Sequence, residues 1–426
     1  MKRADGITYR TAVVPVRMRS KDYRKAHETA YRAGLLFTNL AGFRQEFYDR
    51  EGRDPSRAEA LGQVEDPELL RMHAHSKQAV YEALTEAVSA ALRNIGEGVE
   101  GVRMPHRAKN YRPVAFTRGY GWRITPDGKL ALSLGRRDGR ILLPVPEVTD
   151  ARTGNTVPAD DWGEIELCWD RDNRTWSLHI PYTTHQPPVL GLQNVMAVDE
   201  GIINPMTCAV ETAEAYAVTV INGRSARAVK HRRNTAVAAL RRKQSKCLKG
   251  SRQWRRYDKA VKRAQGKAKT SLRNHNHQVS RKVADLAQEH DTGTITVGDV
   301  RGIEKNTRNT KVRRSGRHQR RRLSQWDRGD QERHVAQKTG VGLVHIDESY
   351  STKTCPACLT RNRPSGRNYR CRTCGFTCHR DAVGAINILM RAKHGEYRAI
   401  DPDKTIRVTY LRATPLHRAP ARSRST

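Results

Sequence analysis

The amino-acid sequence predicts a multidomain α+β protein with a β-rich N-terminal half and an α/β C-terminal half. Three observations predict this class. The chain has 426 residues, which is enough for two or three domains of about 150 residues. Short β-branched runs alternate with long helical patterns. Five of the eight cysteines lie close together near the C-terminus, which indicates a nested metal-binding module rather than a disulfide framework.

The net charge indicates a polyanionic partner. Lys and Arg number 79 against 44 Asp and Glu, a formal balance of +35, and nucleic acid and anionic membrane are the usual partners of such a surface. The sequence has no apolar run of about 18 residues that could span a bilayer. Residues 1–6 are not followed by the apolar core of a signal peptide. We therefore expect a cytoplasmic protein that binds nucleic acid and has no membrane partner.

The N-terminal half predicts a β-rich domain with a helical insertion. Ile7–Met18 is rich in β-branched residues and predicts a strand, and short alternating runs return from about residue 112. In between, apolar residues recur at helical spacing after Ser20, and Asp66-Pro67 predicts the start of another helix. We assign residues 1–19 and 100–188 to the β-rich domain and residues 20–99 to the helical insertion.

The C-terminal half predicts an α/β domain over residues 189–350 and 379–394. Val195–Ile202 is an apolar strand that contains the acidic pair Asp199-Glu200. Two more strands, long helices, a strand, a helix, the strand Val341–Glu348 and a final helix follow. This is the element order of the ribonuclease H-like fold. Residues 395–426 lack an apolar period, so we expect a basic disordered tail.

Two segments carry much of the positive charge. Residues 230–275 hold 17 Lys and Arg against one acidic residue, and they predict a pair of basic helices broken near Gly250. Residues 301–322 hold ten Lys and Arg against one acidic residue and predict a flexible loop. A charge run is usually a solvated face, but so large an imbalance on helices favours contact with phosphates. The predicted nucleic-acid contacts are Arg241, Arg242, Lys243, Lys246, Lys249, Arg252, Arg255 and Arg256.

Two Cys-x-x-Cys pairs predict a structural zinc site within residues 351–378. Cys355 and Cys358 are followed after twelve residues by Cys371 and Cys374, a spacing that suits four thiolates around one zinc ion. Four unligated thiols are the alternative, but a loop with so few apolar residues has no other means of holding its shape. Cys378 and His379 are left out because four ligands complete the site.

Acidic residues at the ends of elements indicate metal-dependent chemistry. Asp199 ends an apolar strand, and Asp381 opens the last helix. Each alone would be an ordinary turn or cap residue. Nucleases on the ribonuclease H-like scaffold, however, gather acids from the first strand, a later strand and the last helix. Such a cluster binds two Mg²⁺ ions about 3.5–4 Å apart, which activate water and stabilise the leaving oxygen.

Several motifs of the C-terminal half resemble those of TnpB proteins, the transposon-encoded RNA-guided nucleases from which the miniature type V CRISPR effectors descend. Besides the basic helices, these motifs are Val198–Ile202 (VDEGI), Tyr350–Cys358 (YSTKTCPAC), Tyr369–Gly375 (YRCRTCG) and His379–Ile388 (HRDAVGAINI). The resemblance covers residues from about 195 to 392. The N-terminal half matches only in architecture, as a β-rich wedge domain with a helical recognition insertion.

The resemblance implies an RNA-guided DNA endonuclease with a RuvC-like domain, in which guide RNA selects target DNA by base pairing. It makes Asp199 the first RuvC carboxylate and Asp381 the third. The second carboxylate of the family, a Glu, is replaced here by Gly298, and the adjacent Asp299 should face away from the site. We predict that Glu348 on the neighbouring strand supplies the missing ligand, although an ordinary exposed acid is the alternative.

Three classes of function stay open at this point. The first is an endonuclease with structural zinc and catalytic magnesium. The second is an RNA-guided DNA-binding protein with an inactive RuvC site that blocks its target. The third is an RNA-free basic zinc-ribbon protein, which explains the charge and the zinc but not the ordered pair Asp199 and Asp381. A monomer and a homodimer on one guide both fit the sequence, as do a transposon and a CRISPR locus.

Overall fold

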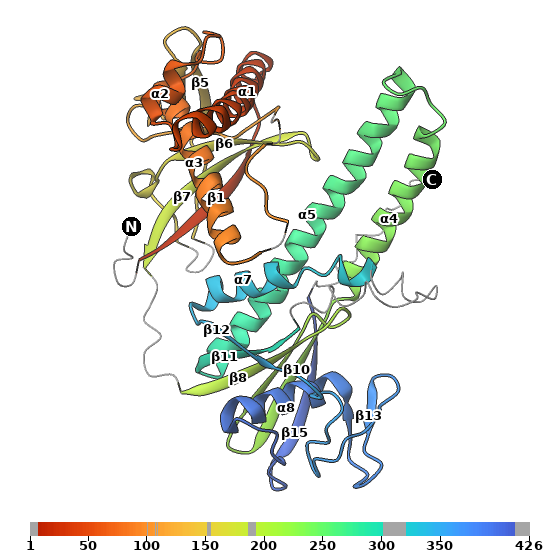
Figure 1. Ribbon diagram of the computed structural model, residues 1–426. Helices are drawn as coiled ribbons and strands as arrows, with labels where there is room; N and C mark the ends of the chain where they lie inside the picture. Colours follow the sequence, from red (N-terminus) through yellow and green to blue (C-terminus); the bar gives the residue numbers. More distant parts are fainter. Residues whose placement is uncertain are drawn as a thin grey trace, which may run out of the picture. The chain divides into compact units, whose positions relative to one another are not determined.

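A computed structural model of the chain describes residues 7–99, 101–106, 108, 110–150, 155–185, 193–300 and 321–413. The chain divides into two compact units, Met1–Gln186 and Pro187–Thr426. Both units mix helices with strands (Figure 1), so the predicted α+β class is confirmed. Over the described residues, every helix is too short or too polar to cross a membrane.

The first unit contains two antiparallel sheets. The larger sheet has the order β1-β7-β6-β2, from β1 (Ile7–Val16), β7 (Thr175–His185), β6 (Ile165–Asp170) and β2 (Val114–Phe116). The smaller is formed by β3 (Trp122–Ile124), β4 (Lys129–Gly135) and β5 (Gly139–Pro144), and a short 3₁₀ helix, η1, covers Ala159–Asp161. Asp138-Gly139 closes the β4–β5 hairpin, where Gly139 has a φ of +68° that suits a tight turn.

Three helices complete the first unit, namely α1 (Ser20–Glu51), α2 (Arg57–Gly62) and α3 (Ala74–Gly96). The predicted helix start at Asp66-Pro67 is wrong, because α3 begins at Ala74 with His73 as its N-cap. Turns precede it, and they bring Leu69, Leu70 and Met72 against the cluster shared by the three helices. Burial of these apolar side chains outweighs the local preference of Pro67 for a first helical position.

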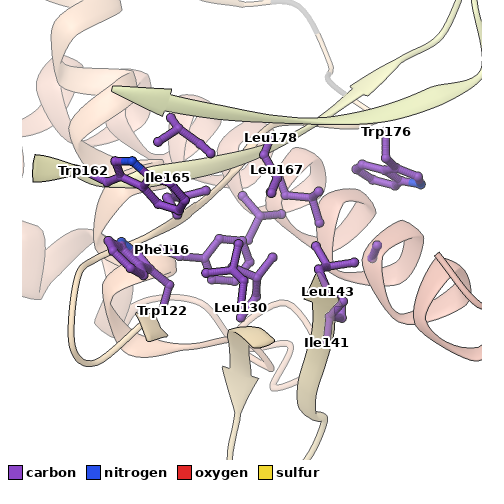
Figure 2. Close-up of a cluster of buried hydrophobic side chains, with 14 of the residues drawn as sticks. Phe116, Trp122, Leu130, Ile141, Leu143, Trp162, Ile165, Leu167, Trp176 and Leu178 are labelled. Carbon is purple, nitrogen blue, oxygen red and sulfur yellow. The ribbon is translucent and has the colours of Figure 1, made fainter. Parts of the chain in front are cut away.

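The main core of the first unit joins both sheets to α1. Figure 2 shows Phe116, Trp122, Leu130, Ile141 and Trp162 among the buried side chains of this cluster. Along β6, Ile165 and Leu167 belong to the cluster, so the alternate residues Glu166 and Cys168 face the other side of the sheet. The first unit therefore has an extensive apolar core of its own.

The second unit contains a six-stranded sheet of order β12-β11-β8-β9-β10-β15. Its strands are β8 (Asn194–Glu200), β9 (Met206–Glu211), β10 (Ala215–Asn222), β11 (Thr292–Asp299), β12 (Leu343–Asp347) and β15 (Thr405–Arg412). β8, β9 and β10 pair antiparallel, whereas β11 lies parallel to both β8 and β12. The element order agrees with the order predicted from the sequence.

Helices cover both faces of this sheet. α4 (Arg224–Gln244) and α5 (Arg252–Glu289) form a long hairpin (Figure 1), followed by α7 (Arg328–Thr339) and α8 (Arg380–His394). The small β13 (Asn368–Arg370) and β14 (Thr377–His379) precede α8. Met196 and Val198 of β8 pack in a cluster with α5 and α7, whereas Ala197 packs with α8. This alternation determines which helix each acidic residue at the end of β8 faces.

The predicted disorder of residues 395–426 is wrong for β15. This strand pairs parallel with β10, with Val408 opposite Val218. Ile406 and Val408 are partly buried against the cluster around α8, while Tyr410 is exposed. Three alternating apolar residues among many basic ones give a weak pattern, which becomes a strand because β10 offers its hydrogen-bonding edge. Residues 414–426 and residues 301–320 of the predicted loop lie outside the described part of the chain.

Candidate functional site

The four cysteines of the predicted zinc site lie together. Cys355 Sγ is 3.6 Å from Cys374 Sγ, and Cys358 Sγ is 3.6 Å from Cys371 Sγ. All four sulfur atoms lie within 4.8 Å of one another. Tetrahedral zinc with Zn–S bonds of about 2.3 Å places its sulfur ligands about 3.8 Å apart. The donor set and its spacing therefore fit one zinc ion.

The backbone of the module repeats one turn around each cysteine pair. Leu359 and Gly375 directly follow the second cysteine of each pair, and both have positive φ, +62° and +77°. Their N–H groups donate to the carbonyls of Cys355 and Cys371. Burial opposes ionisation of Cys371, but backbone N–H groups and the Asn362 amide lower the pKa of its thiol to about 6. The backbone thus holds a thiolate ready for a metal.

The cysteine module is attached to α8. Val383 of α8 belongs to the same buried cluster as Cys355, Tyr369 and Cys371. The Asn387 amide donates to the carbonyl oxygens of Ser351, at 2.6 Å, and Thr354, at 2.8 Å. The orientation of α8 is therefore coupled to the shape of the module.

The acidic pair at the end of β8 divides between the two faces of the sheet. Asp199 lies two residues after Ala197, so its side chain is on the same face of the sheet and points to α8. It is 8% exposed. A Cβ atom at Gly384 of α8 would lie only 2.8 Å from Asp199 Oδ2. Glycine at this position therefore lets the helix backbone approach the carboxylate closely.

Glu348 fills the space that a side chain at position 298 would need. Gly298 of β11 pairs with Ile346 of β12, which packs in the α8 cluster. A Cβ atom built on Gly298 would lie 2.6 Å from Glu348 Oε2, and it would also meet Ile388 of α8 at 2.9 Å. Glu348 is half-buried rather than freely exposed. Its carboxylate thus lies directly over the position where the family has a glutamate.

Asp381, in the first turn of α8, is held from two sides. The Asn204 side-chain amide donates to Asp381 Oδ2 at 2.7 Å, and Arg367 Nη1 contacts the same oxygen at 2.6 Å. Asn204 belongs to the turn after β8, and Arg367 directly precedes β13 of the cysteine module. Sequence reasoning missed both partners, because a lone Asn and a lone Arg carry no spacing signal.

The three carboxylates interact electrostatically. Burial raises the pKa of Asp199 well above its usual range, and the charges of Glu348 and Asp381 raise it further. Burial likewise raises the pKa of Glu348 to about 7, with Asp299 as the next cause. Asp299 lies two residues after Val297, so its side chain is on the opposite face of the sheet from Asp199. Its negative charge nevertheless raises the pKa of Glu348. Such a concentration of negative charge attracts a divalent cation.

The three carboxylates are less tightly grouped than the cysteines. Over the described residues, Asp199, Glu348 and Asp381 do not form a group whose ligand oxygens all lie within 4.8 Å of one another. Over the described residues, the ligand atoms of one other set do approach within 4.8 Å of one another, namely Glu166, Cys168 and His179 on the outer face of the first unit's sheet. Burial raises the pKa of Cys168 to about 12, so this thiol is a poorer metal ligand than Cys371.

Glu200 takes no part in the carboxylate group. It points to the α7 side, where Arg328 Nε lies 4.0 Å from its carboxylate. Burial, and then the neighbouring Glu332 carboxyl, raise its pKa to about 10. His345 of β12 contacts the Glu332 carboxylate at 3.2 Å, so Glu200, Arg328, Glu332 and His345 form one polar cluster on the α7 side. The sequence motif places Asp199 and Glu200 side by side, but only Asp199 faces Glu348 and Asp381.

The predicted basic contacts lie around the tip of the α4–α5 hairpin (Figure 1). All eight are exposed, namely Arg241, Arg242, Lys243, Lys246, Lys249, Arg252, Arg255 and Arg256. Asp258, the one acidic residue within residues 230–275, contacts Arg241 at 3.6 Å and Lys262 at 2.5 Å. The hairpin therefore keeps a large excess of positive charge.

Two family models match the chain. Residues 179–304 match OrfB_IS605, described as "Probable transposase", and residues 330–388 match the Cas12f1-like TNB domain. The second match contains all four cysteines together with Glu348 and Asp381. No curated protein matches the chain. The resemblance to TnpB and the miniature type V effectors is confirmed.

One solved structure shares the overall fold of this chain, and others are similar to a lower degree. The protein in a cryo-EM structure of a Cas12f1–sgRNA–target DNA complex has a TM-score of 0.57 and 13% identity, over 87% of this chain and 82% of that one. Cas_phi3, described as a mini-RNA-guided endonuclease, gives 0.40 and 10% identity over 93% and 94% of the two chains. CasPhi-2 (Cas12j) bound to crRNA gives 0.38 and 10% over 92% and 99%. The Cas12f1 match alone of these three supports a shared overall fold.

Proposed function

We propose that this protein is an RNA-guided DNA endonuclease that cuts phosphodiester bonds at Asp199, Glu348 and Asp381. The observation that carries the proposal is the position of Glu348 over Gly298, on the same face as Asp199 and α8. The site thereby keeps three carboxylates although the usual second position is a glycine. Five of the six strands, β8, β9 and β10 antiparallel and β11 and β12 parallel to β8, have the ribonuclease H arrangement expected of a RuvC domain, and β15 is added at the edge beside β10.

The carboxylate donor set fits magnesium. Mg²⁺ prefers hard oxygen ligands and binds through a few carboxylates together with substrate phosphate. Burial and neighbouring acidic groups raise the pKa of both Asp199 and Glu348, and a bound cation would offset this concentration of negative charge. Bound at these residues, Mg²⁺ would activate water and stabilise the leaving oxygen.

The surrounding residues position the acids and attract substrate. Asn204 fixes the orientation of the Asp381 carboxylate through its 2.7 Å hydrogen bond. The charges of Arg380 and Arg367 partly offset the rise in the pKa of Asp199 that burial causes, and they bring positive charge to a site that must accept a DNA phosphate. The zinc module contributes by holding α8 and Arg367 in place, so its role is structural.

The remaining parts would bind the nucleic acids. The exposed cations of the α4–α5 hairpin are suited to the phosphates of the guide RNA or of the guide–target duplex. The first unit would serve as the wedge domain with its helical recognition insertion. In this assignment the wedge covers residues 1–19 and 100–188, the insertion 20–99, and the RuvC-like domain 189–350 and 379–394.

A second candidate is guided DNA binding without cleavage. The 2.6 Å contact between Arg367 and Asp381 favours it, because an arginine on this oxygen competes with a metal ion. The two functions differ in one measurement. Purified ribonucleoprotein is incubated with target plasmid and Mg²⁺, beside an Asp199→Ala control and a plasmid without the target. Cleavage of the target by the wild-type protein alone supports the endonuclease, and tight guided binding without any cleavage overturns it.

An earlier measurement distinguishes the guided endonuclease and the guided DNA-binding protein from an RNA-free zinc-ribbon protein. The protein is purified from cells that express its own flanking sequence, and the bound nucleic acid is extracted and sequenced. A discrete copurifying RNA is expected. Protein that carries no RNA, and gains none from that locus, would contradict every RNA-guided function proposed here.

A further inference from the structure

The second unit contains a cavity beside the turn that follows Asp199. Its volume is about 590 Å³, within the range of about 300–1,000 Å³ typical of small-ligand pockets. Four segments line it, namely the turn after β8, the first part of α4, His275 of α5 and residues 321–331. All the lining residues belong to the second unit and to the described part of the chain.

The lining of the cavity is cationic. It includes Arg224, Arg227, Lys230, Arg321 and Arg322, against one acidic residue, Asp327. Asp327 contacts Lys230 at 2.9 Å, so this pair is neutral. The positive charge that is left over indicates an anionic ligand, for which phosphate is the natural candidate in a nucleic-acid-binding protein.

The same cavity offers aromatic and amide groups. Trp326 and His275 line it together with Asn234, Gln325 and Gln331. Over the described residues, Trp326 Nε1 and Gln331 Oε1 are buried without a hydrogen-bond partner. Gln331 is only 3% exposed, and its amide nitrogen is already used by Asn276 at 3.0 Å. A buried donor and a buried acceptor left unpaired are costly unless a ligand satisfies them.

The turn that follows β8 contributes residues both to the cavity and to the carboxylate site. Gly201, Ile202 and Pro205 line the cavity, while Asn204 of the same turn donates to Asp381. A ligand in the cavity thus lies on one side of this turn and the proposed cleavage site on the other.

We propose that this cavity binds one nucleotide of the DNA strand to be cut, turned out of the base stack next to the scissile phosphate. The cations would hold the phosphates, Trp326 would stack on the base, and the unpaired Gln331 Oε1 would accept a hydrogen bond from its polar edge. A bare phosphate ion would use the cations but neither the ring nor the amides. This inference rests on the proposed endonuclease function and adds a positioning site for its substrate.

Photochemical cross-linking tests the inference without depending on cleavage. Ribonucleoprotein carrying Asp199→Ala is bound to target DNA in which 5-iododeoxyuridine replaces successive nucleotides around the cut site, and cross-linked peptides are identified by mass spectrometry. A cross-link to Trp326 from one or two adjacent DNA positions is expected. Complete target binding without any cross-link to residues 321–331 would overturn the inference.

Matched variants separate the cavity from the general charge of α4. Arg227→Glu, in the lining, should lower the cross-link yield per bound complex at least fivefold, whereas Arg232→Glu, exposed on the same helix outside the lining, should not. In the active protein, Trp326→Ala should cut at least tenfold more slowly, and Trp326→Phe, which keeps a stacking ring but loses the indole N–H, should lose less of the rate than Trp326→Ala. Equal effects of the two arginine changes would contradict a specific cavity site.

Labelled guide RNA provides the second arm of the test. A cross-link to Trp326 from iodouridine in the guide, with none from the DNA, would overturn the assignment to the cut strand. Failure of the protein to bind RNA or target DNA would show earlier, in the binding step, and the proposed function would then fall together with this inference.

Discussion

The cysteine module and the carboxylate group are neighbours in the second unit, but they are assembled differently. The four cysteines come from 20 consecutive residues, Cys355 to Cys374, and two similar turns bring their sulfur atoms within 4.8 Å. The carboxylates come from the end of β8, the residue after β12 and the start of α8. The module needs only local geometry and a metal, whereas the carboxylate group needs the whole sheet and α8.

The difference predicts how each site fails. Loss of one cysteine should release zinc and loosen the module, with a secondary effect on chemistry through Arg367 and α8. Loss of one carboxylate should remove chemistry and leave the fold intact, because these acids are mutually repulsive in the absence of a cation.

Asp199→Ala and Asp381→Ala should each abolish target cleavage, with a loss of about 10³-fold or more, since each removes oxygen ligands that alanine cannot replace. Guide RNA and target binding should be unchanged. Cleavage rate and binding are measured on the same ribonucleoprotein preparation. Asp347→Asn is the matched control, because Asp347 is an exposed acid paired with Arg391 at 3.0 Å. Normal cleavage by either alanine variant would remove that residue from the site.

Glu348→Ala should be as inactive as the aspartate variants, whereas Asp299→Ala should be mild. Gly298→Glu alone should also impair cleavage, because the new side chain would collide with Glu348. The double variant Gly298→Glu, Glu348→Ala should recover part of the activity, since it returns the carboxylate to the usual strand once Ile388 Cδ1 shifts to admit the new side chain. Cleavage rates of the four variants decide the question. Full activity of Glu348→Ala would exclude the relocated ligand.

Zinc analysis should find one metal ion in the cysteine module, and Cys355→Ser or Cys371→Ser should lose it. The lower melting temperature and slower cleavage expected of these variants follow from the attachment of the module to α8. Cys168→Ser is the control, because Cys168 lies outside the module and its raised pKa disfavours metal binding. Protein purified without chelator that contains no zinc would contradict the structural role of the metal.

Simultaneous charge reversal of Lys243, Arg255 and Arg256 should weaken RNA or duplex binding without unfolding the protein, because all three are exposed. Each phosphate contact contributes about −0.9 to the slope of log affinity against log salt concentration, so the slope should become shallower by about two to three. Affinity is measured across a salt series and the fold by circular dichroism. An unchanged slope would mean that these charges are only a solvated face.

Local patterns predicted the elements well where the signal was both strong and short-range. The β4–β5 hairpin follows from Asp138-Gly139, and the start of α8 follows from the motif around Asp381. The helix start at Asp66-Pro67 and the unstructured tail at β15 were wrong for a common reason. In both cases a few apolar side chains pack against residues that are distant in the sequence. Their burial, or strand pairing in the case of β15, outweighed the local preference for a helix start or for an unstructured tail.

Sequence patterns were enough to locate the four clustered cysteines, the excess of positive charge on the α4–α5 hairpin and the resemblance to TnpB. Each of these rests on residue types at short, fixed spacings. Only the tertiary structure placed Glu348 over Gly298, turned Glu200 towards Arg328 and brought Asn204 and Arg367 to Asp381. These positions depend on strand order and on the face that each side chain takes, and both are fixed when the sheet and its helices pack together.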